Sequence, residues 1–173
     1  MGFLDVSKLD GGAYLGNEVT LSRAQQQTPV WCWAAVIEAV ISYRQGWVPQ
    51  PEIVRQAFGG LVGGLPPALL SAVLNRQYVD FQGGVWQLQG TPLSTAPAAL
   101  HREIQTRQQP VVLALSLPSS LHLVACIGVT GQGAILIHDP LESTAALSRE
   151  LRSDEVPVAA YSVTVRQVRA PGA

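Results

Sequence analysis

The stretch AQQQTPVWCWAAVIEAV, residues 24–40, places Cys32 between two tryptophans at the point where an apolar helix is expected to begin. The following apolar residues recur three and four places apart, the pattern of a helix with one buried stripe: Trp33, Val36, Ile37, Val40 and Ile41. A cysteine in such a helix is commonly a small buried hydrophobe, but the dipole and unpaired N–H groups at a helix N-terminus also favour a thiolate. The stretch therefore leaves two interpretations of Cys32, a packed thiol or a reactive one.

The overall composition indicates one globular domain. The chain has 173 residues, enough for a sizeable core, of which 47% are hydrophobic and 13% are charged. Its formal net charge of -1 provides no basic surface for nucleic acid, so we expect no nucleic-acid partner. The two cysteines form no Cys-x-x-Cys pair and are too few for a disulfide framework.

One uncharged stretch, VVLALSLPSSLHLVACIGVT at residues 111–130, is about long enough to cross a bilayer. Its central Pro-Ser-Ser and its β-branched residues instead favour two buried strands joined by a tight connection. The N-terminus has no basic region followed by an apolar stretch, so no secretory signal is predicted. We expect a soluble protein without membrane insertion, either cytoplasmic or exported without a classical signal peptide.

Hydrophobic periodicity predicts an α+β fold, with a helical N-terminal half packed on a C-terminal antiparallel sheet. We expect a single domain over residues 1–173, in which an N-terminal segment (1–20) is followed by a helical lobe (21–108), a sheet lobe (109–168) and a tail (169–173). Besides the helix at Cys32, helices are predicted at 50–58, 65–77 and 95–108, with glycine-rich loops at 58–67 and 80–90. Strands are predicted at 110–117, 121–129, 133–139 and 156–168, and a polar connection is predicted at 140–155. Neighbouring strands with short connections should pair antiparallel.

The chain has three histidines that could act as a base for a reactive cysteine. His122 opens a predicted strand, where a side chain can face a cleft. His138 and Asp139 end the next strand; because successive strand residues point to opposite faces, they cannot both face His122. If Asp139 orients His122, His138 points away. His101 lies in an amphipathic helix and is predicted to be a surface residue.

The second cysteine, Cys126, is predicted to be a core thiol. It lies inside a strand, four residues beyond His122 and therefore about 13 Å away from it. Metal binding is disfavoured because the cysteines and histidines lack close ligand spacing, and no cofactor is expected.

The order of these residues resembles that of a papain-like cysteine peptidase of the compact bacterial type. Gln26 lies six residues before Cys32, a histidine opens a later strand, and an aspartate stands just before a proline. The pattern Q-x5-C-W-A-A resembles bacterial effector (avirulence) proteases, and H-L-V-x-x-x-G followed by H-D-P resembles the peptidases that trim bacteriocin leaders. The resemblance covers residues 24–140 and implies a papain-like fold in which the nucleophile helix packs on the sheet.

By this resemblance Cys32 is the nucleophile, His122 the base and Asp139 the orienting acid. Gln26 would donate into the oxyanion hole beside the backbone N–H of Cys32, although Gln25 and Gln27 flank it and spacing alone selects it. The implied function is hydrolysis of peptide bonds in a protein or peptide substrate, as a bacterial effector or toxin protease. A cognate inhibitor or immunity protein is a further expected partner.

Other interpretations of these residues stay open. The same residues would support an acyltransferase or a deamidase if the acceptor or the target amide were different. A papain-like binding module without activity is another alternative. His122 could be a buried core histidine whose hydrogen bonds are satisfied and that has no catalytic role. Asp139 before Pro140 could simply form a turn. The aromatic Trp33 after Cys32 departs from the leader peptidases, which usually have glycine there, and plant papains have asparagine in place of Asp139.

Overall fold

The computed structural model describes residues 25–60, 63–117, 121–141 and 148–172. The predicted N-terminal segment and the predicted Pro-Ser-Ser connection lie outside these ranges.

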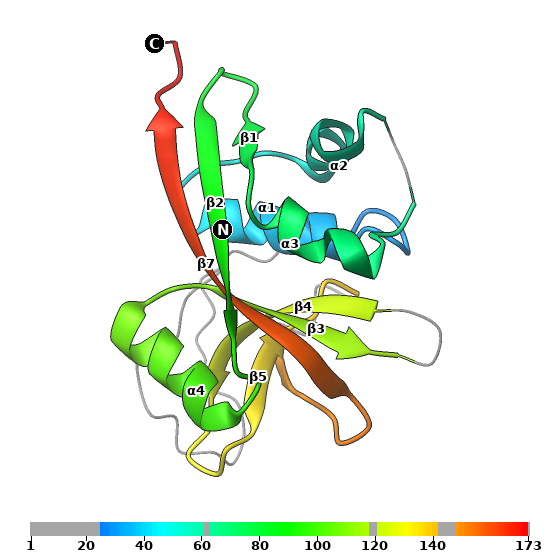
Figure 1. Ribbon diagram of the computed structural model, residues 1–173, viewed down its shortest axis with the longest axis vertical. Coiled ribbons are helices and arrows are strands. Elements are labelled where there is room, and N and C mark those ends of the chain that lie inside the picture. Colours follow the sequence, from blue (N-terminus) through cyan, green and yellow to red (C-terminus); the bar gives the residue numbers. More distant parts are fainter. Residues whose placement is uncertain (1–24, 61–62, 118–120, 142–147, 173) are drawn as a thin grey trace.

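Helices gather mainly in one half of the described structure, and strands run through both halves (Figure 1). The helices are α1 (Cys32–Ser42), α2 (Gln50–Phe58), α3 (Leu70–Val73) and α4 (Pro97–Arg102), with a 3-10 turn at Pro67–Leu69 before α3 and a π-helical turn at Glu103–Arg107 after α4. The strands are β1 (Gln77–Val79), β2 (Val85–Leu93), β3 (Val111–Ser116), β4 (Leu121–Val129), β5 (Ile135–His138), β6 (Arg149–Glu150) and β7 (Val156–Arg169).

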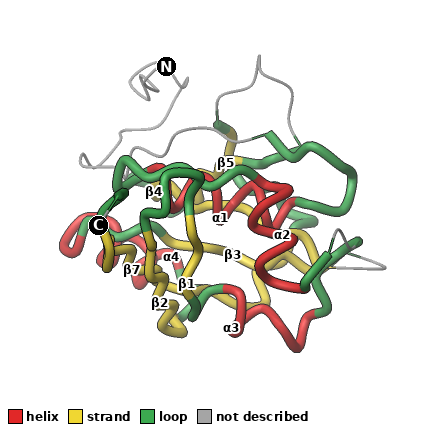
Figure 2. Tube along the Cα trace, turned by 90° about the horizontal axis from the view of Figure 1, so that it is seen from above, coloured by secondary structure: helices red, strands yellow, loops and turns green. Residues whose placement is uncertain are grey.

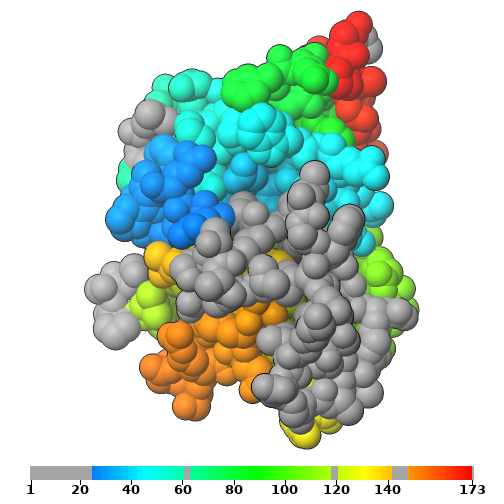
Figure 3. Space-filling model, turned by 180° about the vertical axis from the view of Figure 1, so that it is seen from behind, coloured from blue at the N-terminus to red at the C-terminus, as the bar shows by residue number. Residues whose placement is uncertain are grey.

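The described strands form one sheet of seven strands in the order β1-β2-β7-β3-β4-β5-β6. Each neighbouring pair is antiparallel, which confirms the predicted α+β fold class. The long last strand, β7, pairs with β2 on one side and with β3 on the other, and it runs through both halves of the molecule (Figure 1). On the face of the molecule opposite to that seen in Figure 1, the blue segment that begins at residue 25 lies above the orange segment that begins at residue 148 (Figure 3).

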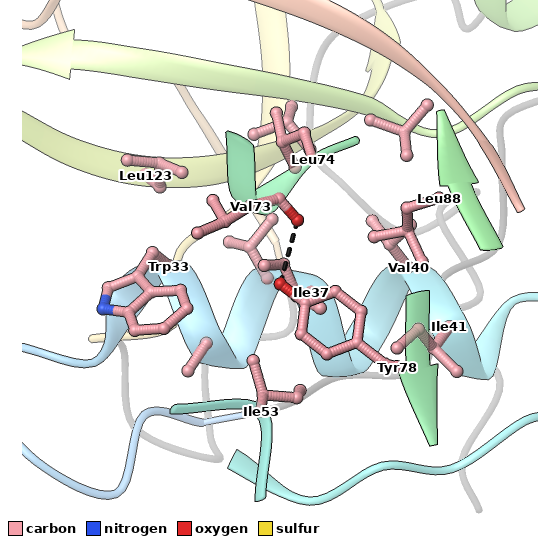
Figure 4. Close-up of a cluster of buried hydrophobic side chains, with 14 of the residues drawn as sticks. Trp33, Ile37, Val40, Ile41, Ile53, Val73, Leu74, Tyr78, Leu88 and Leu123 are labelled. Carbon is pink, nitrogen blue, oxygen red and sulfur yellow. Dashed lines mark hydrogen bonds between the residues drawn. The ribbon is translucent and has the colours of Figure 1, made fainter. Parts of the chain in front are cut away.

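Helix α1, the helix that the sequence predicts to begin at Cys32, lies at the centre of one hydrophobic core. The predicted stripe residues of α1 are all buried, and Ala34, Ala35 and Ala39 are buried as well, so this helix is covered on almost every side. It packs on α2, which lies beside it, and on β4 (Figure 2). Residues from α2, α3, β1 and β2 close the same core around it, and the Tyr78 hydroxyl donates to the Val73 carbonyl at 2.9 Å (Figure 4).

The predicted loop at 80–90 is wrong, because most of it belongs to β2. Val85, Trp86 and Leu88 are buried, and the strand pairs with β7 along its length. The glycines that favoured a loop mark only the tight turn between β1 and β2. There Gly83 adopts a φ of 83°, and one carboxylate oxygen of Asp80 accepts the Gly84 N–H at 2.8 Å.

The predicted helix at 65–77 is much shorter in the structure. Only a 3-10 turn and α3 form, and the chain enters β1 at Gln77. The Asn75 side chain donates to the Ser71 carbonyl at 2.9 Å, so it takes up an acceptor of the last helical turn. The segment predicted to be the helical lobe therefore contributes two strands, β1 and β2, to the sheet.

The helix predicted at 95–108 is divided into α4 and the π-helical turn that follows it, and the loop predicted at 58–67 lies partly outside the described residues. The remaining predicted helix and strands form where they were expected. The helix at 50–58 carries Pro51 in its first turn, and the strands at 110–117, 121–129, 133–139 and 156–168 correspond to β3, β4, β5 and β7. The uncharged stretch considered as a membrane span thus contains β3 and β4. Across the described residues, no helix is both long enough and apolar enough to cross a membrane.

Candidate active site

Three candidate residues from distant parts of the chain meet at one side of the molecule. Cys32 is the first residue of α1, His122 is the second residue of β4, and Asp139 directly follows β5. Since β4 and β5 are antiparallel neighbours, the start of β4 lies near the end of β5. The packing of α1 on β4 then brings the helix start to the same place, which is the juxtaposition that the sequence predicts.

The His122 ring lies between the other two side chains. Its Nε2 atom is 2.6 Å from Oδ1 of Asp139, and both side chains are buried. The side chain of Cys32 hydrogen-bonds the same imidazole. With Nε2 engaged by the carboxylate, Nδ1 is the nitrogen left for the sulfur. His122 is therefore held at both ends, by a carboxylate and by a thiol.

This arrangement favours the charged forms of His122 and Asp139. Burial alone would lower the pKa of His122, but the hydrogen bonds and charges of Asp139 and Cys32 outweigh it and raise this pKa to about 9. Burial alone would raise the pKa of Asp139, but hydrogen bonds from His122 and the Leu141 N–H, together with Arg149, lower it to about 2. At neutral pH the pair is therefore an imidazolium and a carboxylate.

Asp139 also contacts an ion pair, formed by Arg149 and Glu155, that the sequence does not predict. Nη2 of Arg149 lies 2.6 Å from Oδ2 of Asp139 and 2.6 Å from Oε1 of Glu155, and Nη1 donates to the other Glu155 oxygen at 2.8 Å. Hydrogen bonds to Glu155 and then to Asp139 raise the pKa of Arg149, and Arg149 in turn lowers the pKa of Glu155. Both residues fall in a stretch predicted only as a polar connection. The pairing of Arg149 with Ile137 across β5 and β6 brings the guanidinium to Asp139, and nothing in the local sequence indicates this pairing.

Gln26 lies close to the end of β5. Its backbone N–H donates to the Pro140 carbonyl at 2.9 Å, so it sits beside the residue that follows Asp139. Its side-chain Nε2 donates to the Thr28 carbonyl at 2.7 Å. Its Oε1 is buried and has no hydrogen-bond partner among the described residues. The structure thus brings the predicted Gln26 to the same side of the molecule as Asp139.

One known family matches most of the chain. A family model described as papain-like cysteine protease AvrRpt2 matches residues 16–150, which is most of the chain and contains all four predicted site residues. The chain belongs to this family. A search of curated proteins gives no match. The predicted resemblance to papain-like peptidases of the effector type is thereby confirmed, and the protein is a cysteine protease, a hydrolase.

The second thiol of the protease is structural, as the sequence predicts. Cys126 is fully buried in a hydrophobic cluster, and burial raises its pKa to about 12. Its sulfur contacts the Gly128 carbonyl at 3.7 Å. Of the other histidines, His138 is buried beside Asp139 and next to α1, and His101 on α4 is half-buried rather than fully exposed.

A groove of about 530 Å³ lies away from this site in the protease. It begins at Arg44 and Gln45, just beyond the C-terminal end of α1, and Trp47 and Phe81 form part of its wall. These two residues are 57% and 71% exposed, and their rings meet edge to face. None of the groove residues is Cys32, His122 or Asp139, so the groove is separate from the place where these three side chains meet.

Proposed function

We propose that this protease hydrolyses peptide bonds with Cys32 as nucleophile, His122 as general acid and base, and Asp139 as the orienting carboxylate. The observation that carries the proposal is the His122 ring, which hydrogen-bonds Cys32 and lies 2.6 Å from the buried Asp139 carboxylate. An imidazolium beside a cysteine favours the thiolate, which is the nucleophilic form of the residue. Membership of a papain-like cysteine protease family supports the same reaction class.

The reaction follows from the two protonation states of His122. The Cys32 thiolate attacks the carbonyl carbon of the scissile bond, and the carbonyl π electrons move onto oxygen. When the tetrahedral intermediate collapses, the C–N bond breaks and the leaving nitrogen takes a proton from His122. A thioester and a neutral imidazole remain. Water then gives a proton to His122 and attacks the thioester, and the thiolate leaves to release the carboxylic acid product.

We assign stabilisation of the oxyanion to Gln26 and to the backbone N–H of Cys32. An N–H in the first turn of a helix has no intrahelical partner, so that of Cys32 is available to a ligand. One N–H of the Gln26 amide serves the Thr28 carbonyl, and its second N–H remains for an oxyanion. A donor of this kind contributes about 3–4 kcal/mol to transition-state stabilisation in comparable acyl transfer.

We further propose that the enzyme acts as an effector protease on a protein substrate. The family description and the Q-x5-C-W-A-A pattern support this assignment. A cognate inhibitor or immunity protein stays a prediction for the case in which the effector is a toxin.

The test of the reaction is a digest of a complex peptide mixture, followed by mass spectrometry of the products. Peptidase activity generates new N-termini that increase with time and that Cys32→Ala does not generate. A mass increase of about 1 Da at glutamine or asparagine without new termini would instead indicate a deamidase. Peptides joined to an added amine would indicate an acyltransferase. No change in any peptide would contradict the proposed enzyme and favour a binding module.

A further inference from the structure

Residues 25–27, called the Gln26 segment below, are held on one side by the buried side chain of Gln50. Gln50 is the first residue of α2 and is 1% exposed. Its Nε2 donates to the Gln25 carbonyl at 2.8 Å, and its Oε1 accepts the Gln27 N–H at 2.9 Å. These two contacts reproduce the donor and acceptor pair that a neighbouring β-strand would offer to an extended segment.

On the other side, the same short segment is held by the loop after β5. The Gln26 N–H donates to the Pro140 carbonyl at 2.9 Å. Successive residues of an extended chain direct their backbone polar groups to opposite sides, and here the Gln25 carbonyl and the Gln27 N–H face Gln50 while the Gln26 N–H faces Pro140. The backbone of Gln26 is thus fixed between α2 and the residue that follows Asp139.

The amide of Gln50 is itself fixed by the nucleophile helix. Its Nε2 also donates to Oε2 of Glu38, a residue of α1, at 2.8 Å. Oε1 of Glu38 accepts the Trp47 indole N–H at 3.0 Å, which holds the carboxylate from its other side. Both N–H groups and the oxygen of the Gln50 amide therefore have partners, and these partners leave one amide orientation. Because Glu38 belongs to α1, its contact with Gln50 links the position of the Gln26 segment to the helix that begins at Cys32.

We propose that Gln50 is a positioning residue for the oxyanion hole. It does not touch the substrate; it sets the place of Gln26 relative to Cys32 through the Gln25 and Gln27 backbone and through Glu38. This inference rests on the proposed function, because it gives Gln26 the oxyanion-stabilising role. A positional error of about 1 Å in such a group can lower a rate by about 10²-fold.

A purely structural role for Gln50 makes a different prediction. Removal of a buried amide leaves the groups that it bonded without a partner, so Gln50→Met would lower the melting temperature in either case. Only a positioning role makes the effect on the rate depend on Gln26. The decisive quantity is therefore the coupling between the two residues in a double-mutant cycle.

The experiment uses p-nitrophenyl acetate, whose attack by a thiolate forms a tetrahedral oxyanion and releases p-nitrophenolate. The acylation rate is measured for the wild type, Gln50→Met, Gln26→Ala and the double variant, with Cys32→Ala as blank. Gln56→Ala is the matched control, because Gln56 on the same helix makes the same kind of amide pair with the Val79 backbone, far along the helix from Gln50. Alkylation of Cys32 by iodoacetamide, which needs no oxyanion, is followed on the same samples.

We expect Gln50→Met to lower acylation roughly 10- to 100-fold and alkylation less than about 3-fold. In the Gln26→Ala background, Gln50→Met should lower acylation by less than about 3-fold, and Gln56→Ala should leave both rates near those of the wild type. If Gln50→Met unfolds the protein, Glu38→Ala, which keeps the Gln50 amide and removes the carboxylate that anchors it, is measured in its place. Full additivity of the two replacements, or unchanged acylation in a folded variant, would overturn the positioning role. Absence of any Cys32-dependent acylation in the wild type would instead overturn the proposed function.

Discussion

The imidazole Nε2 of His122 lies 2.6 Å from Oδ1 of Asp139, and both side chains are buried. With Cys32 on the other side of the ring, this contact fixes both the orientation and the charge of the histidine. Because Asp139 also receives a hydrogen bond from Arg149 and one from the Leu141 N–H, the carboxylate is held by three groups. These contacts hold the carboxylate in place, and the carboxylate in turn positions the histidine.

Replacement of the nucleophile tests the proposed chemistry. Cys32→Ala should lower peptide turnover by at least about 10⁴-fold, because no other group in the site can form the acyl-enzyme. Because the Cys32 side chain is small, its replacement by alanine should have little effect on the fold, and thermal unfolding followed by circular dichroism will check this. Substantial turnover by a folded Cys32→Ala variant would contradict the assignment.

The base and the orienting acid should differ in importance. His122→Ala removes the group that moves the proton, whereas Asp139→Asn removes the charge that orients it and leaves a side chain of the same shape. We therefore expect a larger loss of kcat/KM in His122→Ala than in Asp139→Asn. Equal losses, accompanied by a lower melting temperature in Asp139→Asn, would show that Asp139 mainly holds the fold together with Arg149.

The raised pKa of His122 predicts how stability depends on pH. From its ordinary value of 6.5, this pKa rises to about 9 in the folded protein, so between these values the folded state binds more protons than the unfolded state. The stabilisation, up to about 3 kcal/mol, is fully present below pH 6.5 and is lost as the pH rises through about 9. Urea unfolding at several pH values should show this fall in the wild type and a flatter profile in His122→Ala. Identical profiles would contradict a protonated His122.

The Arg149 guanidinium should affect the site through its contact with the Asp139 carboxylate. Arg149→Met removes the donor to Oδ2 of Asp139, so the pKa of Asp139 should rise from about 2 towards 3.8, and kcat/KM should fall about 10-fold. A ¹³C NMR titration of the Asp139 carboxyl group measures the pKa directly. Arg166→Met, which removes an exposed arginine from β7, is the matched control. An unchanged Asp139 titration in Arg149→Met would show that the ion pair does not act on this carboxylate.

Local patterns in the sequence predict the elements that carry the site, but not the partners that hold them. Periodicity, a strand end and a proline predict the start of α1 at Cys32, the start of β4 next to His122 and the end of β5 just before Asp139. By contrast, the glycines near the tight turn favoured a loop, so β2 was not predicted. This strand is defined by its pairing with β7.

Residues recruited through long-range pairing leave no such signal. Arg149 reaches Asp139 because β6 pairs with β5, and Gln50 reaches the Gln26 segment because α2 packs on α1. Both residues look like ordinary polar positions in the sequence: one lies in a charged connection, and the other lies between two prolines at a helix start. Their partners are set by tertiary packing, which the spacing of residues along the chain does not specify.

The most direct test of the central claim is the pH dependence of iodoacetamide alkylation at Cys32 and Cys126, followed site by site by mass spectrometry from pH 4 to pH 9. The account predicts that Cys32 reacts much faster than Cys126 below neutral pH, and that His122→Ala removes this advantage, because the imidazolium favours the thiolate. If Cys32 were as inert as the buried Cys126 throughout this range, no thiolate–imidazolium pair would exist and the proposed mechanism would be contradicted.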